Sequence, residues 1–177
     1  MIRITGGEFR SRLLETPNTN LTKPTMDRVR AGVFSAIGDS IKGSRVLDLF
    51  AGSGSYGYES LSRGASFATF VDSSRDAIKA INKNAENLHV KNFNTFLGDF
   101  SSFLSGNPGN FDIIFVDPPY KLDVYENIVN TLLSNNILTS GGIIVLESER
   151  DLNIEESKFK SVRHYKYGLA KIYILRK

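Results

Sequence analysis

From residue 45 onward the chain alternates short apolar runs with segments of helical periodicity. The strand-like runs are residues 45–50, 67–71, 93–97, 111–116 and 143–147. Helical patterns near residues 58–63, 74–88 and 124–133 fall between them, and residues 162–166 and 171–175 read as a hairpin joined through Gly168. This alternation predicts an α/β fold with a mostly parallel sheet, helices on both faces and a closing C-terminal antiparallel hairpin.

The first 40 residues follow a different pattern and read as an appendage. Residues 2–14 mix β-forming residues with Arg and Gly, which predicts a hairpin that turns at Gly6-Gly7. Residues 15–24 read as a loop, and Thr25 is placed to cap a helix whose apolar face includes Val29, Val33 and Ile37. We therefore expect an extension, residues 1–40, and a larger domain, residues 41–177, in one compact unit.

Composition limits the class of protein and its location. A chain of 177 residues is most simply one domain with one core. It contains no cysteine, so disulfides and thiolate metal sites are excluded, and its two histidines match no ligand spacing. It shows no run of about 20 apolar residues and no signal peptide. A cytoplasmic protein without metal or membrane association is expected.

Charge is unevenly distributed along the chain. Residues 1–45 carry a net charge of +4, residues 46–157 of −8, and residues 158–177 of +7. If the two basic ends lie on one side of the fold, they form a surface suited to a phosphate backbone; otherwise they are solubilising charges.

A glycine-rich turn follows the first strand of the repeat. The string Gly52-Ser53-Gly54-Ser55-Tyr56-Gly57 matches GxGxxG between a strand and a helix, and Asp72 follows Gly52 by 20 residues. This is the fingerprint of an adenosine-containing ligand, with the acid placed for a ribose hydroxyl.

The residues around this turn favour S-adenosylmethionine over a dinucleotide. Asp48 precedes the first glycine by four residues, where a carboxylate disfavours a pyrophosphate and suits an ammonium group. A structural hydrogen bond to the loop amides is the alternative for Asp48. Asp99 and Phe100 end the third strand, where they can hold an adenine, although Asp99 can equally cap the next helix. We also expect Phe50, two residues after Asp48, and Ser73, directly after Asp72, to contact the cofactor.

The tetrapeptide Asp117-Pro118-Pro119-Tyr120 stands at the carboxyl end of the strand over residues 111–116. Ligands bind at such ends in open α/β sheets. Asp117 and the Pro118 carbonyl can accept hydrogen bonds from an exocyclic amine, and Tyr120 can stack on the ring that bears it. These residues predict a site that holds a nucleobase and positions its amine for methyl transfer.

Together these motifs resemble class I amino-methyltransferases that act on nucleobases, and in particular the small bacterial 16S ribosomal RNA guanine-N2-methyltransferases. The resemblance covers nearly the whole chain. It rests on residues 47–54 and 117–120, on the N-terminal pieces 3–7, 10–12, 22–25 and 27–30, and on residues 59–65. It implies a seven-stranded Rossmann-like fold, S-adenosylmethionine as donor, and a guanine in 16S ribosomal RNA as acceptor, either in free RNA or in a small-subunit assembly particle.

Carried over by position, the resemblance assigns roles to individual residues. Asp48, Gly52 and Gly54 belong to the cofactor loop, Asp72 holds the ribose and Asp99 the adenine. Residues 1–40 become the RNA-contacting extension of a methyltransferase domain that acts as a monomer. The basic residues proposed to contact RNA are Arg10, Arg12, Lys23, Arg28 and Arg30. The chain departs from the family at Lys23, Asp72, Ser55 and Tyr56, where Arg, Glu, a small residue and an aliphatic residue are usual.

Three other functions remain open from the residues. A DNA adenine-N6 or cytosine-N4 methyltransferase can use the same tetrapeptide, but residues 121–177 leave little chain for a target-recognition domain. A nicotinamide-dependent oxidoreductase is disfavoured by Asp48 and by the lack of an acid/base cluster for hydride transfer. A non-catalytic RNA-binding module is disfavoured by the intact set of acids.

Overall fold

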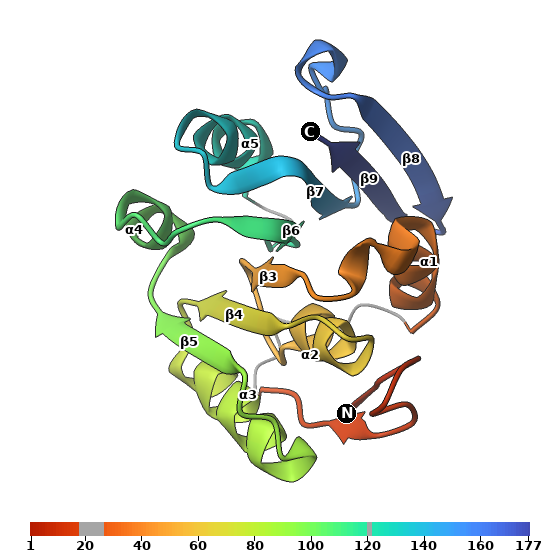
Figure 1. The fold of residues 1–177 in the computed structure, drawn as a ribbon, viewed down its shortest axis with the longest axis vertical. Helices are drawn as coiled ribbons and strands as arrows, with labels where there is room; N and C mark the ends of the chain where they lie inside the picture. The colour runs from red at the N-terminus through yellow and green to blue at the C-terminus, as the bar shows by residue number, and fades with distance from the viewer. Residues whose placement is uncertain (18–26, 120–121) are drawn as a thin grey trace.

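The computed structural model describes residues 1–17, 27–119 and 122–177, and within them seven strands form one sheet (Figure 1). The strands are β3 (Arg45–Asp48), β4 (Phe67–Asp72), β5 (Phe93–Leu97), β6 (Phe111–Val116), β7 (Leu138–Ser148), β8 (Ser161–Tyr167) and β9 (Ala170–Arg176). Their order is β5-β4-β3-β6-β7-β9-β8; β3 to β7 are parallel, and β9 is antiparallel to both β7 and β8. The predicted fold class is confirmed.

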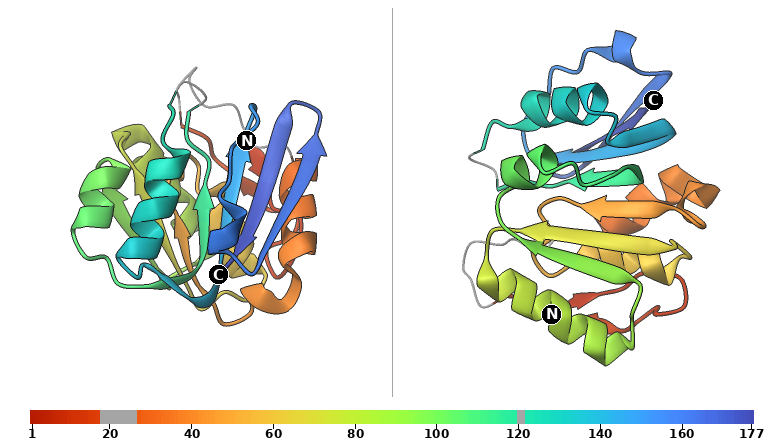
Figure 2. Two further views of the ribbon diagram at one scale, coloured as in Figure 1. Left: turned by 90° about the horizontal axis from the view of Figure 1, so that it is seen from above. Right: turned by 60° about the vertical axis from the view of Figure 1, so that its left-hand side comes forward.

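Helices cover both faces of the sheet, as Figure 2 shows. They are α1 (Asp27–Ile37), α2 (Ser55–Ser62), α3 (Arg75–Leu88), α4 (Phe100–Ser105) and α5 (Tyr125–Ser134), with single 3₁₀ turns at η1 (Gly38–Ile41) and η2 (Glu156–Lys158). Helices α1, α2 and α3 bury their apolar residues on one face, and α4 and α5 on the other. The core therefore consists of two layers separated by the sheet.

Local chemistry explains where the elements begin and end. Ser74 accepts a hydrogen bond from the backbone nitrogen of Ala77 at 3.3 Å and so caps α3, as its sequence position predicts. Strand β7 is longer than expected, because it begins at Leu138 and passes through Gly141 and Gly142. Paired glycines normally indicate a turn, and here the ladder to β6 shifts register between Phe111 and Ile113.

The close packing of α2 on the sheet depends on the last glycine of the loop motif. A Cβ atom at Gly57 would lie 2.1 Å from the Phe70 ring on β4. At Gly54, φ is +78°, a left-handed backbone conformation that residues other than glycine rarely adopt. These two positions require glycine, which explains part of the GxGxxG spacing.

The N-terminal hairpin shares the core of the larger domain. Strands β1 (Ile2–Arg3) and β2 (Leu13–Leu14) pair antiparallel, and Ile2, Ile4 and Leu14 are buried with α1, α2 and α3. Residues 1–14 therefore pack on the body of the protein along its side (Figure 1).

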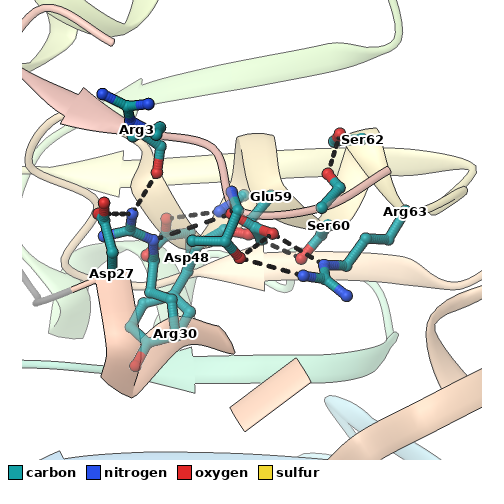
Figure 3. Close-up of polar contacts among 12 residues, drawn as sticks. Arg3, Asp27, Arg30, Asp48, Glu59, Ser60, Ser62 and Arg63 are labelled. Atoms are coloured by element: carbon teal, nitrogen blue, oxygen red, sulfur yellow. Dashed lines mark hydrogen bonds and ion pairs between the residues drawn. The ribbon is translucent and has the colours of Figure 1, made fainter. Parts of the chain in front are cut away.

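Glu59, which has no solvent exposure, joins the hairpin to the helices (Figure 3). Its carboxylate accepts hydrogen bonds from the backbone nitrogen of Thr5 at 2.8 Å and from the Thr5 hydroxyl at 2.7 Å. Arg63 Nε donates to the same carboxylate at 2.8 Å, and Arg30 Nε lies 3.9 Å from it. One buried carboxylate on α2 thus contacts the hairpin, α1 and its own helix.

The burial of Arg30 corrects an expectation from the sequence. Its side chain is 1% exposed, it pairs with Asp27 at 2.7 Å and with Glu59, and it donates to the Arg3 carbonyl. Its guanidinium is buried among these contacts, which Figure 3 shows, and is not available to an RNA phosphate at the surface. The helical pattern placed Arg30 outside the apolar face, but it did not show that Glu59, 29 residues later, lies against that position.

Candidate active site

Five acidic residues line the carboxyl edge of the five parallel strands. In the order of the strands β5, β4, β3, β6 and β7, they are Asp99, Asp72, Asp48, Asp117 and Glu147. The strand order reverses between β3 and β6, so Asp48 and Asp117 flank the point where open α/β sheets bind ligands. The first four are the acids predicted from the sequence.

Asp48 is buried at the end of β3, with 3% of its surface exposed. Its carboxylate accepts a hydrogen bond from the Gly57 backbone nitrogen at 3.0 Å. Burial raises the pKa of Asp48 to about 7, the Gly57 bond opposes this, and the charge of Asp72 adds to it. The structural bond considered from the sequence was to the loop amides, and the observed bond is instead to Gly57 in the first turn of α2. A neighbouring cation would favour the ionised form of this carboxyl.

Asp72 ties the glycine loop to the start of α3. One carboxylate oxygen accepts from the Gly52 backbone nitrogen and the other from the Ser74 backbone nitrogen, both at 2.8 Å. A carboxylate has about four acceptor sites, so these two bonds leave capacity for ribose hydroxyls. Ser73, a predicted cofactor contact, stands between Asp72 and Ser74 in the chain and is exposed.

Asp99 caps α4, as one of its two interpretations predicted. Its carboxylate accepts from the Ser102 backbone nitrogen at 2.8 Å and from the Ser102 hydroxyl at 3.1 Å, and these bonds lower its pKa. The Phe100 and Phe50 rings lie 5.5 Å apart between centroids, and both are half-buried. The loops after β3 and β5 thus bring two of the predicted cofactor contacts together.

Asp117 and Pro118 stand at the exit of β6. Asp117 is half-buried, Pro118 is buried and Pro119 is exposed. Tyr120, the predicted stacking residue, lies outside the described residues. Asp117 is therefore a carboxylate at the ligand-binding edge of the sheet, followed by a stiff turn.

Sequence reasoning missed a buried pair beside Asp117. The Tyr56 hydroxyl donates to Glu147 Oε2 at 2.8 Å, and the Tyr56 ring stacks on Phe115 with 4.6 Å between centroids. Burial, then the charges of Glu147 and Asp117, raise the pKa of Tyr56 well above its usual value, so this hydroxyl keeps its proton and acts as the donor. Tyr125 donates to the Glu147 carbonyl at 2.7 Å. Glu147 could have been found from the sequence in the same way as Asp117, because it also lies at the carboxyl end of a predicted strand.

The predicted RNA-contacting residues lie in different places. Arg10 and Arg12 are exposed on the hairpin, where Arg12 donates to the Asn87 carbonyl at the end of α3 at 2.7 Å. Arg28 is exposed at the start of α1, and Lys23 lies outside the described residues. The hairpin packs on α2 and α3, whereas β8 and β9 form the opposite edge of the sheet (Figure 1), so Arg10 and Arg12 do not share a patch with the basic C-terminal strands. Helix α1, which carries Arg28, does contact that edge, where Arg176 on β9 donates to the Ala36 carbonyl.

The described residues contain no group of three or more His, Asp or Glu side chains arranged to hold a metal ion. In the same part of the chain, no helix is long and apolar enough to cross a membrane. A cavity of about 500 Å³ lies between α5 and residues 150–159, next to the exit of β7.

Comparisons with known proteins identify the family. The sequence profile of the family described as conserved hypothetical protein 95 matches residues 2–176. The ribosomal RNA small subunit methyltransferase D of Escherichia coli K12 is 37% identical over 148 residues, which cover 84% of this chain and 75% of that protein. The solved structure of yhhF from Escherichia coli superposes with a TM-score of 0.89 at 33% identity, over 99% of this chain and 97% of that one.

A more distant structure has the same fold. SMU.776, solved in complex with SAH, gives a TM-score of 0.68 at 16% identity, over 85% of this chain and 49% of that chain. S-adenosylmethionine, predicted from the sequence as the cofactor, is the cofactor of this class of methyltransferase. The chain belongs to the family described as conserved hypothetical protein 95, a family of class I methyltransferases that includes ribosomal RNA small subunit methyltransferase D.

Proposed function

We propose that this protein transfers a methyl group from S-adenosylmethionine to the exocyclic N2 amine of a guanine in 16S ribosomal RNA. The observation that carries the proposal is the position of Asp117 at the switch point of the sheet, beside Asp48 and the glycine loop. A carboxylate there can hold an amine within reach of a methyl donor bound at the loop. The names of the relatives support small-subunit ribosomal RNA as the substrate.

The donor set at the glycine loop fits S-adenosylmethionine better than a dinucleotide. The cofactor supplies an activated methyl group on a positively charged sulfur. Asp48 would hold its ammonium group, Asp72 the ribose hydroxyls, and Asp99, Phe50 and Phe100 the adenine. In its ionised form Asp48 attracts a cation and repels a pyrophosphate, and a bound cation would oppose the burial that raises the pKa of this carboxyl to about 7.

Asp117 would accept a hydrogen bond from the target amine, and the Pro118 carbonyl would accept a second. These two acceptors favour a pyramidal nitrogen and direct its lone pair at the methyl group, so the gain is one of position and electrostatics. The amine can lose its proton after methyl transfer, which removes the need for a strong base. Tyr120 would stack on the extruded base.

RNA is favoured over DNA because relatives of this chain are named as ribosomal RNA small subunit methyltransferases. Residues 125–176 contain α5, β7, η2, β8 and β9, all part of the methyltransferase body. We assign the exposed Arg10, Arg12 and Arg28, together with Lys23, to RNA phosphates, and we expect the protein to act as a monomer where ribosomes are assembled.

Analysis of the methylated nucleoside tests the proposal. The protein is incubated with methyl-labelled S-adenosylmethionine and with 16S rRNA, supplied as a free transcript or in small-subunit particles. The RNA is then digested and its nucleosides are separated by mass spectrometry. N2-methylguanosine is the expected product. Label in N6-methyladenosine or N4-methylcytidine, or in a DNA duplex offered in parallel, would contradict the assignment.

A further inference from the structure

We propose that the turn between β8 and β9, residues 166–171, is a second RNA-contacting element that holds the strand next to the target nucleotide. This inference rests on the proposed RNA substrate and extends the contact surface beyond the N-terminal hairpin. The turn contributes Lys166, Lys171 and the exposed Leu169.

Strand register places this turn at the ligand-binding edge of the sheet. In the β7–β9 ladder Ser148 pairs with Lys171, so β9 begins where β7 ends. Strand β6, which leads to Asp117, is the other neighbour of β7. Strands are spaced by about 4.8 Å, so the start of β9 lies roughly 10 Å across the sheet from the exit of β6. This distance is within the span of two nucleotides of an RNA strand.

The hairpin β1–β2 lies further from this edge. Its turn bonds to the end of α2, where the Glu8 backbone nitrogen donates to the Ser62 carbonyl at 2.7 Å. Helix α2 starts at the glycine loop and runs away from it for eight residues, or about 12 Å. The hairpin residues Arg10 and Arg12 therefore give an RNA strand no contact close to Asp117.

The charges of the β8–β9 turn suit a phosphate. Lys166 and Lys171 are directly opposite each other in the ladder, where two like charges repel each other. Lys171 pairs with Asp151 at 2.7 Å and is 16% exposed. The pKa of Asp151 is lowered first by this bond and the charge of Lys171, and then by His164 and Lys166. Asp151 therefore binds Lys171, and Lys166 on the opposite strand is exposed.

An apolar side chain stands at the tip of the same turn. Leu169 is 69% exposed, and Gly168 before it has a φ of +63°, which allows the tight turn. A leucine flanked by cations fits a nucleic acid, because the apolar side chain can pack on an unstacked base while the lysine contacts its phosphate. Residues 158–177 contain seven basic residues and no acidic one, so β8 and β9 themselves add no repulsion of a phosphate. The acid in contact with this turn is Asp151, which Lys171 binds.

Two single substitutions test the two contacts separately, with free 16S rRNA transcript as the probe. Lys166→Gln should weaken binding and flatten the dependence of log affinity on log salt by up to about 0.7, the value for one lost phosphate contact to single-stranded RNA. Leu169→Ser should weaken binding on the order of tenfold and leave the salt slope unchanged, because the lost contact is apolar. Leu169→Met, which keeps an apolar side chain, should retain wild-type affinity. Lys91 is exposed and lies far from this edge, so Lys91→Gln should behave as wild type.

The controls separate the failure of this inference from that of the proposed function. Wild-type protein that methylates 16S rRNA while both variants bind it normally would overturn the turn assignment alone. Wild-type protein that binds S-adenosylmethionine but neither binds nor methylates 16S rRNA, as free transcript or in small-subunit particles, would overturn both. Light scattering on the wild type and the variants measures their oligomeric state. If the wild type is a dimer that Leu169→Ser converts to a monomer with RNA binding intact, the turn is a self-association surface and the proposal is overturned.

Discussion

Asp48 shows how one buried acid can select a cofactor. Its burial at the end of β3 raises its pKa to about 7, so at neutral pH about half of the molecules carry the proton. A bound ammonium group favours the ionised form, and binding must then expel this proton. Cofactor affinity is thereby coupled to pH in a range where ordinary aspartates do not titrate.

We predict that S-adenosylmethionine affinity falls by about fivefold between pH 7 and pH 6. The sign follows from the raised pKa, because the protonated fraction of Asp48 increases as pH falls and the cation binds the ionised form. Isothermal calorimetry at several pH values measures the affinity and the proton release. Asp48→Asn should bind weakly at every pH, with a flat profile. Equal wild-type affinity at pH 6 and pH 7 would show that the ammonium group is held elsewhere.

Tyr56 and Glu147 form the second residue-scale feature, a buried hydrogen bond between positions 91 residues apart. Tyr56→Phe keeps the ring on Phe115 and removes only the donor, so a buried carboxylate oxygen loses a partner. We predict a loss of about 1.5–3 kcal/mol in the free energy of unfolding, measured by urea titration. Unchanged stability of the Phe variant would mean that the hydroxyl is dispensable to Glu147.

At the scale of elements, Glu59 links the N-terminal hairpin to α1 and α2. Its carboxylate lies against Arg30 and Arg63 and accepts two bonds from Thr5. Removal of one member of a buried ion pair leaves the other charges without compensation, which is costly. The hairpin is thus held by polar contacts as well as by Ile2, Ile4 and Leu14.

Glu59→Gln should lower the free energy of unfolding by about 3 kcal/mol or more, because Arg63 would lose its carboxylate partner and the buried charge of Arg30 would be offset by Asp27 without Glu59. Chemical denaturation measures this loss. Asp39→Asn is the matched control, since Asp39 pairs with Lys42 on an exposed turn where an ion pair contributes little. If the two variants lose stability equally, Glu59 is not the link between these elements.

At the scale of the whole molecule, the sheet was predictable because its signals are local. The runs over residues 93–97 and 111–116 are bounded by turn residues, and β5 and β6 have the predicted limits. The four aspartates of the edge were also predictable, since each is the last residue of a strand or follows its end closely, and the β–α alternation determines the direction of that strand. Position relative to a strand is enough to find such residues.

Contacts between residues distant in the sequence were not predictable in this way. Arg30 carried the charge expected of an RNA contact, and only the packing of α1 against α2 shows that Glu59 buries it. Glu147 has its partner Tyr56 on another element, and the β8–β9 turn reaches the edge only through the register of β9 on β7. These three features depend on contacts between distant parts of the chain, and the periodicity of the sequence contains no information about such contacts.

The role of Asp117 is the central claim, and a comparison of cofactor binding with single-turnover methyl transfer in Asp117→Ala tests it most directly. Asp39→Ala, an exposed acid outside the site, is the control and should match wild type in both measurements. We predict that Asp117→Ala binds S-adenosylmethionine with nearly wild-type affinity and transfers the methyl group to 16S rRNA at a rate reduced by about a hundredfold or more, because its contacts are made to the acceptor amine. A variant that transfers the methyl group at the wild-type rate would contradict the account.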